Sequence, residues 1–479
     1  MRGHAVKVLL RFGLCFLCLI VGFAPSHGQA IGGASSGMIS SSFSPTFFQA
    51  TVQFPSAART SQAPTTLNLE HAIQLAIENN LETLRAREQR REAEGMKQES
   101  LAGLLPNISG AAYQANLTQN LAALGFRPGA FGLRSTFIGP FNNFDARIRL
   151  AQSIFDLGAI RRFQAGRAGI TLAGLREELA REQVATVTAL AYLEALRAER
   201  AVAAAEADVE LARALLRLAE DQRNAGVATG VDVTRAETRL AEEQLRLAQA
   251  QTAAEQARLN LKRIIGVPLE ASLTLTDQLR FVSEPLPSLA EALAAAAQNR
   301  REILLAEQQV KISALERQAA SAEQLPSLEF VGDYGTSGIT PTDTALPTRR
   351  VAIQLNVPIF NGGLTRGRIV VAASRQRQAE LELDSIRRQV EEDVRLAFAN
   401  LRTAEAQVRA ADESVRLAER ELEMARDRFQ AGVGDNLEVV NAQTALANAR
   451  EAQVTALAVY NAARLNLASA LGRAEKFRW

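Results

Sequence analysis

Residues 394–429 read VRLAFANLRTAEAQVRAADESVRLAERELEMARDRF, and their spacing predicts the fold of the chain. An apolar side chain returns every seven residues from Val394 to Phe429, and an alanine stands three places after each of the first five. A seven-residue apolar repeat is typical of helices that pack side by side, and alanine on the seam allows their axes to approach toward the close end of roughly 8–10 Å. We therefore predict a long helix here, packed along its length against at least one other helix.

The chain repeats itself. The same row of alanines occurs 206 residues earlier, from Ala191 to Ala219. Leu105-Pro106 returns 220 residues later as Leu325-Pro326, and Ile154-Phe155 returns 205 residues later as Ile359-Phe360. Self-similarity at fixed offsets indicates a duplicated structural unit. We expect a first repeat over residues 67–266, a linker over 267–287, a second repeat over 288–472 and a C-terminal tail over 473–479.

Prolines divide each repeat into segments. Proline is absent between Pro140 and Pro268 and again after Pro358, and the alanine, leucine, glutamate and arginine content of those stretches favours helix. Each repeat is expected to contain a helix, two strands joined by a loop, a long helix, a glycine-containing turn and a return helix. The expected helices cover residues 69–104, 159–224 and 231–265 in the first repeat and 289–323, 364–430 and 436–471 in the second.

Before each long helix the apolar period changes from near 3.6 to 2, which predicts strands. The expected strands cover residues 108–117, 144–155, 328–334 and 350–358. Strands of about ten residues with one apolar and one polar face are typical of a membrane-spanning barrel with a polar lumen. Four strands cannot close alone, and an open edge in lipid would leave unpaired backbone groups that cost several kcal/mol each. Several copies must complete the barrel, and strand arithmetic leaves both two copies and three copies possible.

The first 30 residues have the pattern of a secretory signal peptide, with basic residues, an apolar run from Leu14 to Phe23 and small residues at Gly28 and Ala30. We expect residues 1–30 to be removed and residues 31–66 to be extended or disordered. Both cysteines lie within the signal, so the mature chain would contain no thiol and one imidazole, that of His71. A disulfide framework, a Cys/His zinc site and a Ser-His-Asp triad are then hard to build. We predict that the protein is not an enzyme and needs no cofactor or metal.

Charge also limits the partners. The chain has 54 Lys and Arg, three of them in the signal, against 52 Asp and Glu, so the mature net charge is about −1 and no electrostatic case for nucleic acid exists. A periplasmic or secreted structural coiled coil without a transport role is the alternative. It explains the heptads but not the two pairs of strands with opposed faces.

Two elements of the second repeat resemble the TolC-type outer-membrane efflux proteins. They are Pro-Ile-Phe-Asn-Gly-Gly at residues 358–363 and Arg-Phe-Gln-Ala-Gly-Val-Gly-Asp-Asn-Leu-Glu-Val at residues 428–439. The resemblance covers about residues 67–472, and the first repeat departs from it at Ser153 and Arg223. It implies a mainly α fold with a small β part, in which a homotrimer forms a 12-stranded β-barrel in outer-membrane lipid that an α-helical barrel continues through the periplasm. It also implies a passive exit duct of a tripartite efflux or type I secretion system, served by a periplasmic adaptor (membrane fusion) protein and an inner-membrane pump of the RND, ABC or MFS type.

The resemblance also implies an adaptor contact at the turns between the long and return helices. The residues expected there are Gly226, Val227, Gly432 and Val433. Glycine at these turns is also what a helix end requires, because the residue that closes a helix commonly adopts a left-handed conformation. The contact and the plain helix cap both remain possible for these positions.

A periplasmic aperture is the second site that the resemblance implies. The residues expected there are Asp232, Arg235, Asp435 and Glu438. Asp232 and Glu438 are equivalent by the 206-residue offset and would supply six carboxylates in a trimer. Where the family often has a further acidic residue, this chain has Arg235 and Asn441, so a latch between Arg235 and a carboxylate on a neighbouring helix is a possible substitute. An acidic residue in the first turn of a helix is also an ordinary cap or dipole partner.

Overall fold

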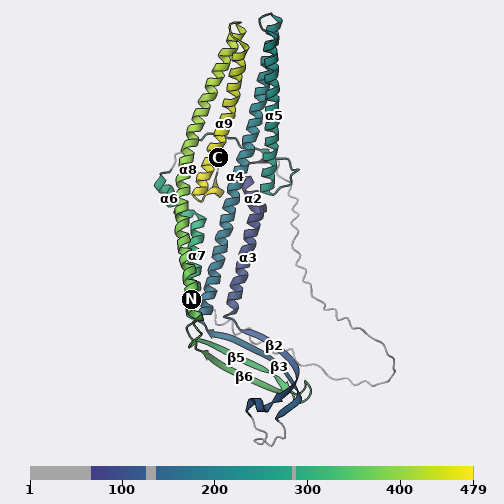
Figure 1. Ribbon diagram of the computed structural model, residues 1–479, viewed down its shortest axis with the longest axis vertical. Helices are drawn as coiled ribbons and strands as arrows, with labels where there is room; N and C mark the ends of the chain where they lie inside the picture. The colour runs from purple at the N-terminus through teal and green to yellow at the C-terminus, as the bar shows by residue number, and fades with distance from the viewer. Residues whose placement is uncertain (1–65, 126–135, 283–286, 478–479) are drawn as a thin grey trace, which may run out of the picture. The chain divides into compact units, whose positions relative to one another are not determined.

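The structure is a computed structural model and describes residues 66–125, 136–282 and 287–477. The expected signal peptide, and residues 31–65 of the segment that follows it, lie outside the described residues. Residues 61–479 form one compact unit in which a sheet lies at one end of a set of long helices, and the turns between long and return helices lie at the other (Figure 1). Both repeats therefore belong to a single unit rather than to separate domains.

Four helices make up about half of the unit. The long helices are α4 (Leu157–Asn224) and α8 (Leu364–Gln430), and the return helices are α5 (Gly230–Ile265) and α9 (Asn436–Ala470). Helix α4 has 68 residues and is about 100 Å long at ~1.5 Å per residue. In α8 the heptad row from Val394 to Phe429 and its alanines are buried, apart from a half-buried Val415. This seam packs α8 against α9, just as α4 packs against α5.

Four antiparallel strands form one sheet in the order β2-β3-β5-β6. They are β2 (Asn107–Asn120), β3 (Phe137–Phe155), β5 (Ser327–Gly338) and β6 (Leu346–Asn356). A short 3-10 helix, η1 (Leu121–Leu124), follows β2. Strand β6 ends at Asn356 rather than 358, and all four strands extend beyond the expected ranges at the ends far from the helices. Polar residues there break the apolar alternation, but hairpin pairing between backbones continues past it.

The prediction of one continuous helix at the start of each repeat is wrong. The structure has α2 (Leu69–Asn79) and α3 (Leu81–Ala102) in the first repeat, and α6 (Leu289–Asn299) and α7 (Arg301–Ala322) in the second. Asn80 is extended, with ψ of 136°, and its side chain accepts a hydrogen bond from the N–H of Glu82 and so caps α3. Its amide also donates to the carbonyl of Ile264 at 3.2 Å. Because of this break, α2 packs its apolar side into an apolar core about midway between the sheet and the turns, which we call the mid-height core. Helix α3 continues from the break toward the sheet.

The segment expected to be a linker is part of that core. Strand β4 (Thr274–Leu275) pairs in parallel with β1 (Thr66–Leu67), and Asp277 accepts hydrogen bonds from the N–H of Leu69 at 2.8 Å and the hydroxyl of Tyr192 at 2.9 Å. The expected C-terminal tail also packs here, with the 3-10 helix η3 (Ala474–Lys476) contacting α4 and Phe477 lying against the same apolar cluster. The duplicated unit is thus tied together by residues between and after the repeats.

The strands and helices follow the same side-by-side order, from the first repeat to the second, at three levels of the unit: in the sheet, beside the sheet and toward the turns. In the sheet the order is β2-β3-β5-β6, and beside the sheet the packing order of the helices is α3-α4-α7-α8. Toward the turns it is α5-α4-α9-α8. At every level one edge belongs to the first repeat and the other edge to the second.

Candidate functional site

The turn between α4 and α5 is one tip of the molecule. Gly226 adopts a left-handed conformation with φ of +77°, and the N–H of Val227 donates back to the carbonyl of Gln222 at 2.9 Å. This hydrogen bond closes the end of α4 and turns the chain back. The side chain of Val227 is 60% exposed at the tip.

The turn between α8 and α9 repeats this geometry. Gly432 has φ of +72°, and the N–H groups of Val433 and Gly434 donate to the carbonyl of Arg428 at 3.1 and 3.0 Å. Gly434 has no room for a side chain, because a Cβ there would lie 2.9 Å from the Cβ of Arg428. Val433 is 73% exposed. Each turn thus presents one apolar side chain on a rigid backbone.

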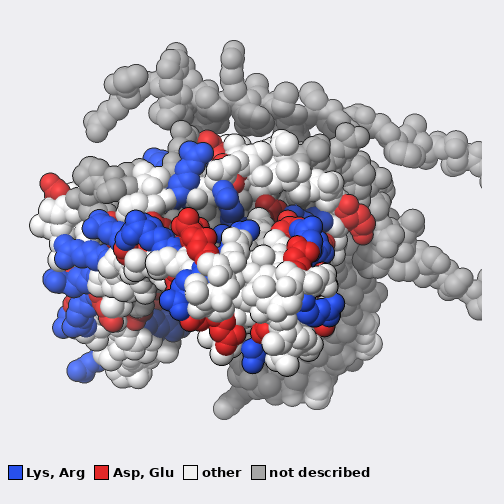
Figure 2. All heavy atoms as spheres, turned by 90° about the horizontal axis from the view of Figure 1, so that it is seen from above, with Lys and Arg blue, Asp and Glu red and all other residues white. Residues whose placement is uncertain are grey.

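The two tips are joined within one protomer. The side-chain amide of Gln222 on α4 donates to the carbonyl of Phe429 on α8 at 2.9 Å. That of Asn436 on α9 donates to the carbonyl of Asp232 on α5 at 2.8 Å. An apolar cluster that includes Phe429 and Val439 fills the space below the turns. Seen end-on, this face of the unit shows basic and acidic side chains interspersed with uncharged ones (Figure 2).

The expected aperture residues occupy equivalent places but differ in their contacts. Asp232 is the third residue of α5, and its carboxylate accepts hydrogen bonds from the hydroxyl of Thr229 at 2.7 Å and from the backbone N–H of Thr229 at 2.9 Å. These two hydrogen bonds hold the pKa of Asp232 below its ordinary value, and the nearby Arg235 guanidinium adds to the effect. The ion pair between Arg235 and Asp232 measures 3.5 Å. This ion pair lies within one helix, α5, rather than between neighbouring helices.

Glu438 is the third residue of α9 and pairs with Arg428 across the turn at 3.2 Å. Its side chain is 48% exposed, whereas that of Asp232 is 13% exposed. Asp435 caps α9, since its side chain accepts a hydrogen bond from the N–H of Leu437 at 3.1 Å. The four expected aperture residues are therefore brought together near the tips, with Glu438 the more open of the two equivalent acids.

The sheet has two chemically distinct faces. We call one the apolar face; its most exposed residues are Ile108, Ile148, Tyr334, Val351, Ile353 and Leu355. The alternate residues form the polar face, where Arg147 bridges Asp145 on its own strand and Asp333 on β5. Arg350 on β6 also contacts Asp333, at 3.0 Å. The sequence predicted the alternation but not this ionic network, which depends on the register between strands from different repeats.

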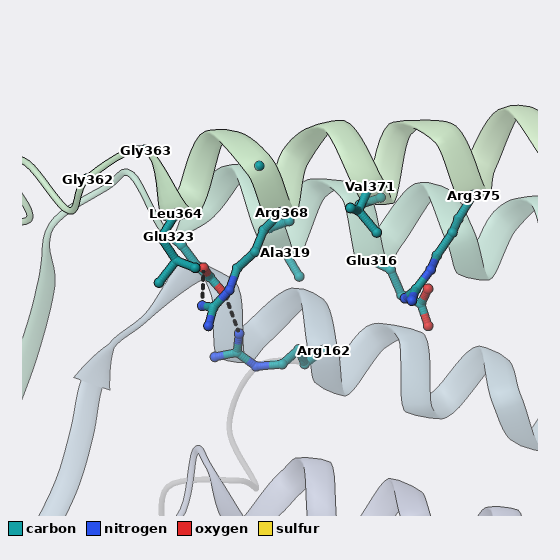
Figure 3. A pocket seen from close by; sticks show the side chains of 13 residues that line it. Arg162, Glu316, Ala319, Glu323, Gly362, Gly363, Leu364, Arg368, Val371 and Arg375 are labelled. Carbon is teal, nitrogen blue, oxygen red and sulfur yellow. Dashed lines mark hydrogen bonds and ion pairs between the residues drawn. The ribbon is translucent and has the colours of Figure 1, made fainter.

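The long helices start beside the sheet and are joined there by one carboxylate. Glu323, just after α7, contacts Arg162 of α4 at 3.9 Å and Arg368 of α8 at 2.9 Å (Figure 3). These residues line an open groove of about 920 Å³ with Gly362 and Gly363, which precede α8. The contact fixes the start of both long helices relative to α7.

A buried ionic cluster between α4, α5 and α9 was missed by the sequence analysis. Arg450 of α9 contacts Asp208 of α4 at 2.8 Å, and Arg239 contacts Glu243 within α5. Burial raises the pKa of both Asp208 and Glu243, and the facing arginines oppose that effect. The cluster borders a cavity of about 400 Å³. The charges sit beside the heptad seam, where no periodic signal distinguishes them from a solvated face.

Within the described residues, no helix is both long enough and apolar enough to cross a bilayer.

Comparison with known proteins decides the family. The sequence profile of the family described as "outer membrane efflux protein" matches residues 72–267 and 292–473, which together are more than half of the chain. The chain belongs to the outer membrane efflux protein family. The two matched segments correspond to the two repeats and leave out most of the segment between them.

Individual members of the family show the same likeness. This outer-membrane efflux protein is 30% identical to protein CyaE of Bordetella pertussis over 348 residues, which are 71% of this chain and 73% of CyaE. It is 24% identical to the outer membrane protein TolC of Escherichia coli over 346 residues, 69% of this chain and 70% of TolC. The outer membrane protein VceC of Vibrio cholerae has the same fold, with a TM-score of 0.72 at 18% identity over 85% of this chain and 96% of VceC.

Family membership establishes the general role of the protein. The relatives are channel proteins, and the chain is an outer-membrane exit duct for efflux or type I secretion with a helical extension into the periplasm. The known channels with this fold are trimers in which an α-barrel continues a β-barrel. The protomer described above contains an open sheet, so the barrel is not closed by one chain.

Proposed function

We propose that three copies of this chain assemble into a passive duct that an inner-membrane pump supplies through a periplasmic adaptor. The observation that carries this proposal is the pair of free edges found at every level of the protomer. One edge belongs to the first repeat and one to the second: β2 and β6 in the sheet, α3 and α8 beside it, and α5 and α8 toward the turns. Unlike edges of this kind suit a closed ring of identical subunits in head-to-tail contact.

The number of copies follows from the size of the lumen. Two chains would supply about eight strands, whose own side chains fill a barrel, whereas three supply about twelve and leave an aqueous passage. The ionic polar face described above suits such a passage, and the apolar face suits lipid. Trimers among the known channels with this fold support the same number.

The duct performs no chemistry of its own in this proposal. The energy for transport comes from a pump of the RND, ABC or MFS type in the inner membrane, and an adaptor connects the pump to the duct. The alternative of a structural coiled coil without a transport role does not explain why exposed isoleucines and leucines gather on one face of the sheet.

Purification from outer membranes tests the proposal. In detergent, light scattering is expected to give the mass of three chains, and planar bilayers are expected to show discrete ion-conducting steps. Recovery only in the soluble periplasmic fraction, or a monomer that never conducts ions, would contradict the proposal and favour the structural coiled coil.

We infer that Asp232 and Glu438 line the aperture at the tips. Both are the third residue of a return helix, so a ring of three chains would hold six of these carboxylates at one height. Replacing Asp232 with Asn and Glu438 with Gln removes the charges while leaving oxygen atoms that can still accept hydrogen bonds, from Thr229 in the first case and from Arg428 in the second. The double variant is expected to lose part of the cation preference of the wild-type channel, measured as reversal potential in a salt gradient.

The matched control removes two acids from other helix N-termini. Glu291 of α6 accepts a hydrogen bond from the N–H of Ser288, the same cap that Asp232 makes, and Glu82 lies in the first turn of α3. Glu291→Gln with Glu82→Gln is expected to leave the reversal potential unchanged. Equal reversal potentials for wild type and the Asp232/Glu438 variant would remove those residues from the aperture.

We infer that the two exposed valines, with the glycines that position them, contact the adaptor. The side chain of Val227 lies against the turn that carries Val433, since a Cβ on Gly432 would lie 3.6 Å from Cγ1 of Val227. Val433→Asp and Val227→Asp are each expected to lower transport in cells and co-purification of the adaptor by about ten-fold or more, because an apolar anchor at an interface centre contributes on the order of 2 kcal/mol. Val187→Asp, an exposed valine of α4 far from the turn, is the control.

Channel assembly separates an adaptor effect from a folding effect. The tip variants are expected to remain trimeric and to conduct ions in bilayers, because the turns are closed by backbone hydrogen bonds that the valine side chains do not make. Normal transport with both valines replaced by Asp would place the adaptor contact elsewhere.

A further inference from the structure

The two hairpins of the sheet obey the offsets that relate the two repeats in the sequence. Asn107 on β2 pairs with Ala151 on β3. Adding 220 to the first number and 205 to the second gives Ser327 and Asn356, and these two residues are partners in the β5–β6 hairpin. The repeats are therefore equivalent in strand register as well as in sequence.

The contact between β3 and β5 joins the first repeat to the second within one chain. Its register is regular along most of its length, with Arg149 opposite Asp333 and Arg147 opposite Gly335. By the repeat, β3 corresponds to β6 and β5 corresponds to β2. The equivalent contact would therefore join β6 to a β2 strand, but within one chain these two strands are the opposite edges of the sheet. Only a second copy can supply it.

We propose that β6 of one protomer pairs antiparallel with β2 of the next, with Gln354 opposite Tyr113. Adding 205 to Arg149 gives Gln354, and subtracting 220 from Asp333 gives Tyr113. The same shift sets Ala352 opposite Ala115. This inference rests on the proposed ring of identical subunits and adds the register that joins them.

The two faces of the sheet support this register independently. Tyr113 lies opposite Asp145 and Gln354 lies opposite Glu329, so both side chains point to the polar face. Leu355, which would oppose Ala112, stands with it on the apolar face. A slip of one residue would pair lumen-facing with lipid-facing positions along the whole contact, because side chains alternate in direction along a strand. The register derived from the repeat keeps each face continuous around the ring.

Backbone hydrogen bonding gives the contact its driving force, whereas Leu355 and Ile353 on β6, 64% and 67% exposed in the protomer, would face lipid on the outside of the ring. The outward backbone groups of β2 and β6 find no strand partner within the described sheet. In lipid each such unpaired group costs several kcal/mol, so pairing of the two edges strongly favours the closed form.

Paired cysteines in the full-length chain test the register. The sequence has two cysteines, Cys15 and Cys18, both in the expected signal peptide, so introduced thiols would be alone in the mature protein. Two pairs are used: Tyr113→Cys with Gln354→Cys on the polar face, and Ala112→Cys with Leu355→Cys on the apolar face. The two faces of an antiparallel contact differ in whether opposed residues exchange hydrogen bonds, so the pairs sample both spacings. The two introduced thiols are linked either by mild oxidation to a disulfide or, in a parallel sample, by a short bifunctional thiol reagent.

A control pair keeps the same face but shifts the register. Leu117→Cys with Gln354→Cys moves one thiol four residues along β2, about 13 Å at ~3.3 Å per residue. That distance exceeds the ~7 Å limit between the Cα atoms of a disulfide, so about ten-fold less covalent dimer and trimer is expected than from the in-register pairs. Variants with a single introduced cysteine show any product that does not come from the intended pair.

Light scattering on the same detergent samples separates the outcomes. The register is supported if the in-register pairs give covalent dimers and trimers while the control pair gives monomers. If the particles have the mass of three chains but the control links as well as the in-register pairs, or neither in-register pair links, the register is overturned and the trimer stands. If every variant and the wild type have the mass of one chain, the proposed function fails instead.

Discussion

An arginine in place of Ile353 is expected to abolish stable trimers in the outer membrane. Ile353 lies on the apolar face of β6 and is 67% exposed in the protomer, so in the assembled duct it faces lipid. An arginine near the middle of the lipid-facing surface of a barrel costs about 2–4 kcal/mol, and a trimer contains the substitution three times. The measurement is the amount of protein that resists extraction from outer membranes and migrates as a trimer in unheated gels.

The adjacent residue provides the matched control. Gln354 follows Ile353 on the same strand but points to the polar face, opposite Glu329. Gln354→Arg places the same side chain in the aqueous lumen beside an acidic neighbour, and it is expected to leave the amount of trimer close to that of wild type. If the two arginine variants lose trimers equally, the assignment of the faces to lipid and lumen is wrong.

The second large effect is expected at Tyr192, in the mid-height core. Tyr192 is fully buried, and its hydroxyl donates to the carbonyl of Leu67 at 3.0 Å and to the carboxylate of Asp277 at 2.9 Å. Burial raises the pKa of its phenol, which therefore stays protonated and able to donate at all ordinary pH values. Tyr192→Ala is expected to lower the free energy of unfolding by about 3–5 kcal/mol, because it opens a cavity and leaves the acceptors without their donor.

Tyr192→Phe separates the packing of the ring from the hydrogen bonds of the hydroxyl. The ring stays, and Asp277 still receives the N–H of Leu69, so a loss of about 1–2 kcal/mol is expected. Thermal unfolding in detergent, followed by circular dichroism, ranks wild type, Phe and Ala variants in that order. If Tyr192→Ala unfolds at the temperature of Tyr192→Phe, the core around β1 and β4 does not limit the stability of the unit.

Part of the fold could be read from local patterns. The seven-residue spacing from Val394 to Phe429 predicted α8, and the structure begins and ends that helix at residues 364 and 430 as expected. The break at Asn80 was missed, because an asparagine inside a helical pattern gives no stronger signal than a surface position. It is decided by the hydrogen bond from Asn80 to Ile264, 184 residues away.

In the candidate site, too, some features could be predicted from the sequence and others could not. Glycines before exposed valines predicted the two tip turns, since a left-handed helix end favours glycine at a fixed place in the chain. The contacts of the acids could not be predicted. Asp232 is held by its own cap while Glu438 reaches Arg428, and that difference depends on how each turn folds back onto the preceding helix.

The amino-acid sequence by itself determined the long paired helices, the amphipathic strands and the duplication, because each is a periodicity or offset along one chain. Only the tertiary structure decided which repeat supplies each free edge, how β3 and β5 align, and that the segment between the repeats forms a core with Tyr192. Those features arise from contacts between residues 85 or more positions apart or from strand pairing between repeats. Side-chain burial and hydrogen bonding in the folded chain select such contacts, and no local spacing encodes them.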